Sequence, residues 1–202
     1  MNYGAEIRSS KCRGCEPQVD HVPGEPGVWV LLFGDMLIFS VFFVTYAVHR
    51  GDNVDLYRQS QSHLNQVFGI LNTFLMLSSS WCVANAVQMA RMERTASSAR
   101  LFRLGLLCGL CFVVVKCFEY GEKVRYGITP STNEFFMYYY LFTGIHLMHV
   151  VVGMAVVGIL SSYVQTGVID ARRLRNIESG ASFWHVVDLL WIVLFALFYI
   201  AV

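Results

Sequence analysis

Five apolar segments dominate this sequence, and each is long enough to cross the roughly 30 Å of hydrocarbon in a bilayer as a helix. Of the 202 residues, 55% are hydrophobic and only 14% are charged, which is typical of a membrane protein. The sequence therefore predicts an all-α fold, a polytopic bundle of five transmembrane helices. The predicted helices cover residues 28–48, 67–89, 101–118, 136–164 and 181–202.

Residues 1–26 precede the first apolar segment and contain no apolar run of the signal-peptide type. They end in a run of prolines and glycines, which stops any helix before the first span. We expect two parts: a cytoplasmic N-terminal tail over residues 1–26 and a five-helix transmembrane domain over residues 27–202. The first span is expected to act as its own insertion signal.

Lysine and arginine are unevenly distributed between the segments that connect the spans, although the net charge is only +1. Ten fall on the side of the N-terminal tail and four on the opposite side. Because cytoplasmic segments are enriched in Lys and Arg, this pattern predicts a cytoplasmic N-terminus and, after five crossings, a periplasmic C-terminus. The ten are Arg8, Lys11, Arg13, Arg91, Arg94, Arg100, Arg103, Arg172, Arg173 and Arg175; the four are Arg50, Arg58, Lys123 and Arg125.

A stripe of polar and small residues runs along the fourth apolar segment. Thr143, His146, His149 and Gly153 fall on one side of a helix that turns by about 100° per residue. Such a stripe should face protein and not lipid. One interpretation is that the histidines bond backbone carbonyls or carboxylates of neighbouring helices. The other is a haem or metal site, because imidazole is the commonest metal ligand.

Polar side chains lie inside other spans as well. Asp35 lies within the first span, where an ionised carboxylate costs about 2.5–3.5 kcal/mol unless it is protonated, paired or hydrated. Its expected partners are His149, His185 or Asp188, because Lys116 belongs to the opposite end of its own span. The full intramembrane polar set is Asp35, Asn72, Lys116, Glu119, His146, His149, His185 and Asp188.

Short spacings in the second and third spans indicate how helices pack. Lys116 and Glu119 are three positions apart on a helix, which predicts a structural ion pair. Gly105 and Gly109 form a GxxxG pattern, which indicates close contact with another helix. Three consecutive serines at 78–80 favour a similarly close approach.

The cysteines give little indication of a metal site. Cys12 and Cys15 form a CxxC with His21 nearby, which is too few ligands for a structural zinc site, and a plain flexible tail is the alternative. The other four lie within spans, where free cysteine usually packs as a small hydrophobe. These are Cys82, Cys108, Cys111 and Cys117.

Three classes of function are compatible with such a polar interior. A proton-coupled transporter would favour broken helices or a two-fold repeat, and the sequence shows neither. A metalloenzyme could use His146, His149, His185 and Asp188, but we expect the last two near the cytoplasmic start of their span and His149 near the middle of its own. The third class is a subunit that packs on a partner and presents a structured polar interior.

Several linked motifs narrow this choice. They are Thr143-Gly144-x-His146-x-x-His149, then Glu178, then Trp184-His185-x-x-Asp188-x-x-Trp191, together with Gly34-Asp35-Met36, Leu71-Asn72-Thr73 and Glu119-Tyr120. In this order, over residues 26–202, the chain resembles subunit III of haem-copper oxidases.

Three departures from the family pattern suggest a branch. The family mostly has glutamate in place of Asp35 and a neutral residue in place of Lys116, and the mitochondrial form has seven spans. Five spans and Lys116 are most similar to the short branch associated with bacterial nitric oxide reductase. The five-span subunit III of quinol oxidases is the nearest alternative.

The resemblance implies that this chain has no active site and no haem or metal of its own. It would pack on a haem-containing catalytic subunit I, which carries haem and copper or iron, in a bacterial inner membrane, and no nucleic acid is expected to bind. Asp35 would be linked to proton uptake and turnover stability. A stand-alone proton-coupled transporter is the alternative function.

The resemblance also implies roles for further side chains. The intramembrane polar set and Glu178 would have proton-linked or structural roles. Phospholipid would bind in a cleft between the first helices and the remainder. The lipid-cleft or interface residues would be Trp29, Trp184 and Trp191.

Overall fold

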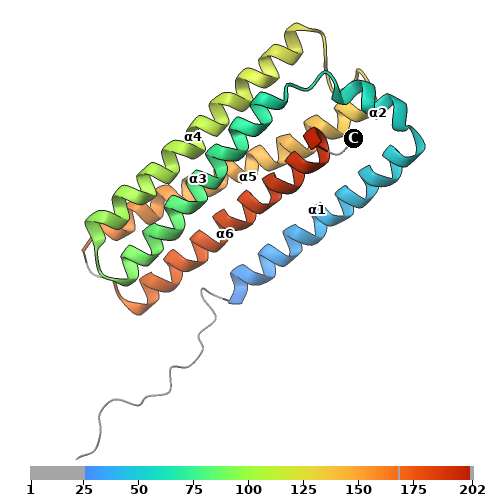
Figure 1. The fold of residues 1–202 in the computed structure, drawn as a ribbon. Helices are drawn as coiled ribbons and strands as arrows, with labels where there is room; N and C mark the ends of the chain where they lie inside the picture. Colours follow the sequence, from blue (N-terminus) through green and yellow to red (C-terminus); the bar gives the residue numbers. More distant parts are fainter. Residues whose placement is uncertain (1–25, 168, 201–202) are drawn as a thin grey trace, which may run out of the picture.

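The structure, a computed structural model, describes residues 26–167 and 169–200 and is entirely helical in that part (Figure 1). Five helices are long and apolar enough to cross a membrane, which confirms the predicted fold class. The elements are α1 (Pro26–Asp52), α2 (Val54–Gln61), α3 (Gln66–Arg91), α4 (Thr95–Arg125), α5 (Glu134–Gln165), α6 (Ala171–Phe195) and a π-helical turn (Ala196–Ile200).

Three predicted helix boundaries were wrong by six residues or more. The last helix begins at Ala171 and not at Ala181, and α4 covers Thr95–Arg125 and not residues 101–118. Hydropathy detects the part of a helix that suits hydrocarbon, whereas the charged turns beyond it remain helical. As a result, His185 and Asp188 lie near the middle of the last helix and not near its start.

The connection between α1 and α3 contains a further short helix, α2. Tyr57 on α2 is buried against the rings of Tyr46 on α1 and Phe135 on α5. The side chain of Asn133, which caps the N-terminus of α5, donates a hydrogen bond to Ser60 Oγ at 2.8 Å. This short amphipathic helix therefore packs against both α1 and the start of α5.

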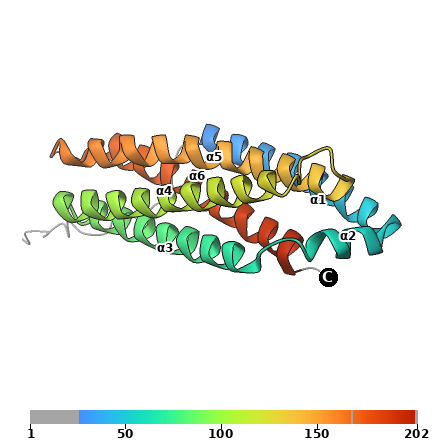
Figure 2. The same cartoon turned by 90° about the horizontal axis from the view of Figure 1, so that it is seen from above.

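Helices α3, α4, α5 and α6 pack lengthwise as a four-helix bundle, and α1 lies outside it along α5 and α6 (Figures 1 and 2). A single narrow stripe of α1, formed by Leu32, Phe39 and Tyr46 at seven-residue spacing, is buried. Most other apolar side chains of α1 are exposed, as expected for a helix surrounded by lipid or by another subunit.

Glycines permit the closest approaches between helices. A Cβ atom on Gly105 would lie 3.1 Å from Val83, and one on Gly109 would lie 3.1 Å from Trp184. The GxxxG pattern therefore marks a close contact, as predicted. The tightest site is Gly153 on α5, where a Cβ would lie 2.7 Å from the Trp184 ring.

We expect Gly153→Ala to lower the free energy of unfolding in mixed micelles by about 1–3 kcal/mol, because the added methyl group collides with a fully buried indole. Gly158→Ala is the matched control on the same helix, since no atom lies within 4 Å of its added Cβ. It should leave stability unchanged or raise it by up to about 1 kcal/mol. Equal effects of the two variants would contradict this packing.

Candidate functional site

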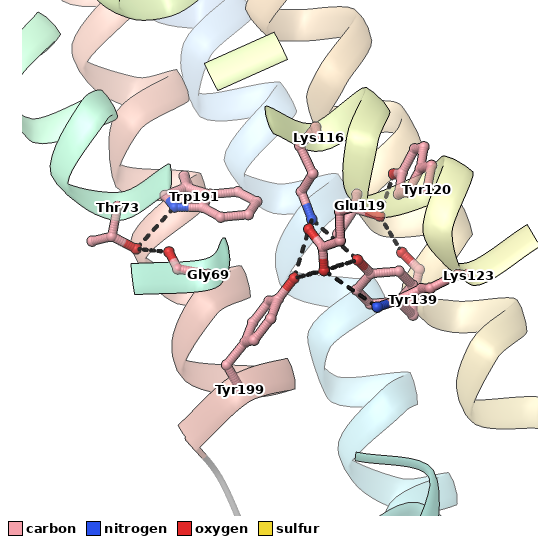
Figure 3. A network of polar contacts seen from close by, with 10 residues as sticks. Gly69, Thr73, Lys116, Glu119, Tyr120, Lys123, Tyr139, Trp191 and Tyr199 are labelled. Carbon is pink, nitrogen blue, oxygen red and sulfur yellow. Dashed lines mark hydrogen bonds and ion pairs between the residues drawn. The ribbon is translucent and has the colours of Figure 1, made fainter. Parts of the chain in front are cut away.

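A buried carboxylate, Glu119, is the centre of the largest polar network in the described part of the chain (Figure 3). Its Oε2 accepts a hydrogen bond from Lys116 Nζ at 2.9 Å, and Lys123 Nζ lies 3.5 Å from its Oε1. The Lys116 and Glu119 side chains are 1% and 0% exposed. The ion pair predicted from their spacing is therefore confirmed, and it is entirely shielded.

Two tyrosines from distant helices complete the shell around Glu119. The Tyr139 hydroxyl on α5 and the Tyr199 hydroxyl on the π-helical turn donate to Oε1 at 2.8 and 2.5 Å. Lys116 Nζ also donates to both hydroxyls at 3.2 Å. All three protons of the Lys116 ammonium and both oxygens of the Glu119 carboxylate thus have a partner, which is what makes a buried ion pair tolerable.

The network continues into α3 and α5. Lys116 Nζ lies 4.9 Å from the centroid of the Trp191 ring, a cation–π contact, and Trp191 Nε1 donates to Thr73 Oγ1 on α3 at 3.1 Å. Tyr120 Oη and Thr143 Oγ1 share a hydrogen bond at 2.6 Å. The ammonium and carboxylate groups are enclosed by protein, so this centre fastens helices together and offers no substrate access.

A second polar centre joins α1 to α5. His149 Nε2 lies 3.3 Å from Asp35 Oδ1, as predicted from their similar depths, and Lys116 pairs elsewhere. His149 Nδ1 lies 2.9 Å from the Ile145 carbonyl, which only accepts, so Nδ1 carries a proton.

A third polar centre lies between α3 and α6. Ser80 Oγ and His185 Nδ1 are 2.6 Å apart, and the Asp188 carboxyl interacts with both groups. Sequence analysis missed Ser80, because a run of three serines indicated only small side chains for packing. Nearer the N-terminus of α6, Glu178 pairs with Arg91 of α3 at 2.8 Å.

Two predicted polar residues are buried without hydrogen bonds. His146 is 0% exposed, and neither ring nitrogen has a partner among the described residues. It packs instead against the rings of Phe112 and Trp191, so the predicted bond to a carbonyl or carboxylate was wrong. Asn72 is equally buried, and its amide oxygen and nitrogen likewise have no partner within the described ranges.

The residues considered as metal ligands are not brought together. Within residues 26–167 and 169–200, no group of three or more His, Cys, Asp or Glu side chains is placed to hold an ion. His149 pairs with Asp35, and His185 with Ser80. The Cys12, Cys15 and His21 set lies outside the described residues.

The three tryptophans predicted at a lipid cleft or interface occupy two kinds of position. Trp29 is half-buried on α1, with its ring centroid 6.1 Å from that of Phe33. Trp184 and Trp191 are 0% exposed inside the four-helix bundle, so neither can contact lipid. The Trp184 ring is buried because it fills the space beside Gly109 and Gly153.

Comparison with known proteins agrees with the motif analysis. The family model described as Cytochrome c oxidase subunit III matches residues 25–202. The chain is 27% identical over 175 residues to cytochrome bo(3) ubiquinol oxidase subunit 3 of Buchnera aphidicola subsp. Acyrthosiphon pisum, covering 86% of this chain and 84% of the relative. It is 25% identical over 194 residues to cytochrome c oxidase subunit 3 of Thermostichus vulcanus, covering 93% and 94% of the two chains.

We expect Glu119→Gln to destabilise the chain by about 3–5 kcal/mol, because it leaves the Lys116 ammonium buried without a counter-charge. The measurement is the free energy of unfolding in mixed micelles. Glu122→Gln, at an exposed position one turn away, should change it by less than about 0.5 kcal/mol. Adding Lys116→Met to Glu119→Gln should recover most of the loss, and a double variant as unstable as Glu119→Gln would contradict the assignment.

Proposed function

The chain belongs to the cytochrome c oxidase subunit III family, and we propose that it packs on a haem-containing subunit I as a non-redox subunit that supports proton uptake and sustained turnover. The observation that carries this proposal is the Asp35–His149 pair. The pair joins α1, a helix with a largely exposed apolar surface, to the bundle. Ionisable side chains inside a membrane are costly and indicate a role in function or assembly.

The chemistry of the pair suits a proton-holding role. Each side chain is 17% exposed, so the site is neither sealed like Glu119 nor open like a surface residue. An imidazole nitrogen and a carboxylate oxygen in contact are groups that can hold a proton between them. Asp35 Oδ2 is buried without a hydrogen-bond partner in the described part of the chain, so the carboxyl group has capacity for one more hydrogen bond.

We further propose that phospholipid binds beside α1. A cavity of about 380 Å³ lies between the N-terminal half of α1 and the helices α5 and α6, and its lining is mostly apolar, which suits an acyl chain. The residues around it are Val28, Leu31, Val152, Val156, Asn176, Ser179, Gly180 and Phe183. Trp29 follows Val28, one of the residues around this cavity, and would lie at the cytoplasmic boundary, given the proposed orientation of the N-terminus.

We propose that the chain is a subunit III of the short five-span type, in a complex of a bacterial inner membrane. The chain covers 84% and 92% of two Buchnera relatives named as ubiquinol oxidase subunits, so its length suits this type. Lys116 is the feature that favours the branch associated with nitric oxide reductase. Comparing NO and O₂ consumption by the purified complex distinguishes the two branches.

We expect the tagged chain, extracted gently from its own membrane, to copurify in a fixed ratio with a haem protein. The chain purified alone should show no haem absorbance and no stoichiometric copper, iron or zinc. A chain that purifies without any haem protein and catalyses proton-coupled uptake in vesicles would instead establish the transporter alternative.

We expect Asp35→Asn to assemble normally, because the amide keeps the shape and one hydrogen bond to His149, but to lower sustained turnover per haem. The loss should be less than about tenfold, below the roughly 10²–10⁴-fold effect of removing a catalytic acid or base. Ser40→Ala is the control, since Ser40 is exposed on the same helix and bonds only its own backbone. Unaltered turnover in Asp35→Asn, with failed assembly in Asp35→Leu, would mean that Asp35 only fastens α1.

A further inference from the structure

The seam between α3 and α6, defined as the surface around Ser80, His185 and Asp188, has polar groups at an unusual depth. Ser80 lies near the middle of α3, and His185 lies near the middle of the last helix (Ala171–Ile200). Both side chains are only half-buried. The seam therefore presents a histidine and a hydroxyl to the outside of the bundle within the apolar part of both helices.

The surroundings of the seam are apolar and exposed. Leu77 on α3 is 44% exposed, and Leu189 and Ile192 on α6 are 47% and 41% exposed. Helical phase places these side chains directly outward of Ser80 and His185. Apart from Asp188, which is 6% exposed, no Asp, Glu, Lys or Arg lies in residues 66–90 of α3 or 179–200 of the last helix.

The hydrogen bonds within this chain leave some polar atoms of the seam without a partner. His185 uses Nδ1 for Ser80, and Nε2 has no partner among the described residues. Asp188 is 6% exposed, and its Oδ1 is buried without a partner in the same part of the chain, so it is already shielded from lipid. An unpaired ring nitrogen facing lipid costs several kcal/mol, so a protein group should cover His185 Nε2.

From this geometry we infer that a membrane-spanning helix of the partner subunit packs on the α3–α6 seam, and that a hydrogen-bonding side chain of that helix, such as Ser, Thr, Asn or Gln, reaches His185 Nε2. The inference rests on the proposed function, since it requires a partner subunit. Lipid acyl chains are a poor alternative occupant, because they have neither donors nor acceptors.

The other polar links between α3 and α6 explain why the seam suits a docking helix. Gln66 Nε2 donates to the Tyr199 carbonyl at 3.4 Å, Trp191 donates to Thr73, and Arg91 pairs with Glu178. Because these bonds hold α3 against α6 above and below Ser80, the seam is rigid before a partner arrives. A pre-organised surface loses less conformational entropy on binding.

Photocrosslinking in the intact complex tests the inference. A benzophenone amino acid replaces Leu189 beside the seam, or Leu110, which is 52% exposed near the middle of α4 and serves as the control at the same depth on another helix. We expect crosslinks from position 189 to a transmembrane peptide of the partner, identified by mass spectrometry, and only lipid adducts from position 110. Lipid adducts alone from position 189, or partner crosslinks from position 110 only, would overturn the inference. Failure of the chain to copurify with any haem protein is a different result, which contradicts the proposed function itself.

The role of His185 is tested separately by measuring how fast the chain dissociates from the complex during detergent washing. His185→Phe should dissociate at least about threefold faster than the wild type, the effect expected for one hydrogen bond between membrane helices, whereas His185→Gln should stay within about twofold. Ser80→Ala removes only contacts within this chain, those of Ser80 with His185 and Asp188, and should also stay within about twofold. If Ser80→Ala dissociates as fast as His185→Phe, His185 acts only within this chain and its contact with the partner is refuted.

Discussion

A charged carboxylate enclosed by helices constrains this fold more than any other group. Glu119 is tolerable in the interior only with Lys116 and two tyrosine hydroxyls in place, and those hydroxyls come from α5 and from the turn after α6. Shifting either helix along its axis by one residue, about 1.5 Å, would break bonds of 2.5–2.9 Å. The ion pair therefore specifies the register of three helices, whereas the apolar contacts around it would tolerate sliding.

Helix α1 is attached by a different kind of contact. Its links to the bundle are Asp35 with His149, His49 with Glu134 at 2.9 Å, and a line of aromatic rings that includes Phe39 and Tyr46. Both polar links are partly exposed histidine–carboxylate pairs, which are weaker than the enclosed network at Glu119. The chain thus consists of a tightly specified bundle and one helix whose outer surface is available to lipid or to a partner.

Sequence reasoning succeeded where contacts follow from spacing or depth. Lys116 with Glu119 follows from a three-residue separation, and depth in the spans limited the partners of Asp35 to three, of which the structure has His149. Tyr139, Tyr199 and Ser80 could not be found this way, because they meet their partners only through the packing of helices far apart in the chain. The last helix begins ten residues earlier than predicted, so His185 and Asp188 lie about 15 Å further from its first residue than expected.

Polar groups near the helix ends and polar groups in the apolar parts of the helices differ in their hydrogen bonds. Near the helix ends, Glu119, Glu134 and Glu178 all have charged or histidine partners within the chain. In the apolar parts, Asp35 Oδ2 and Asp188 Oδ1 are buried without a partner among the described residues, whereas His185 Nε2 is unpaired on a half-buried side chain. A buried oxygen is already shielded from lipid by this chain, but an unpaired ring nitrogen at the lipid-facing surface costs several kcal/mol unless protein covers it. His185 is therefore the group among these whose hydrogen bond a neighbouring subunit would complete.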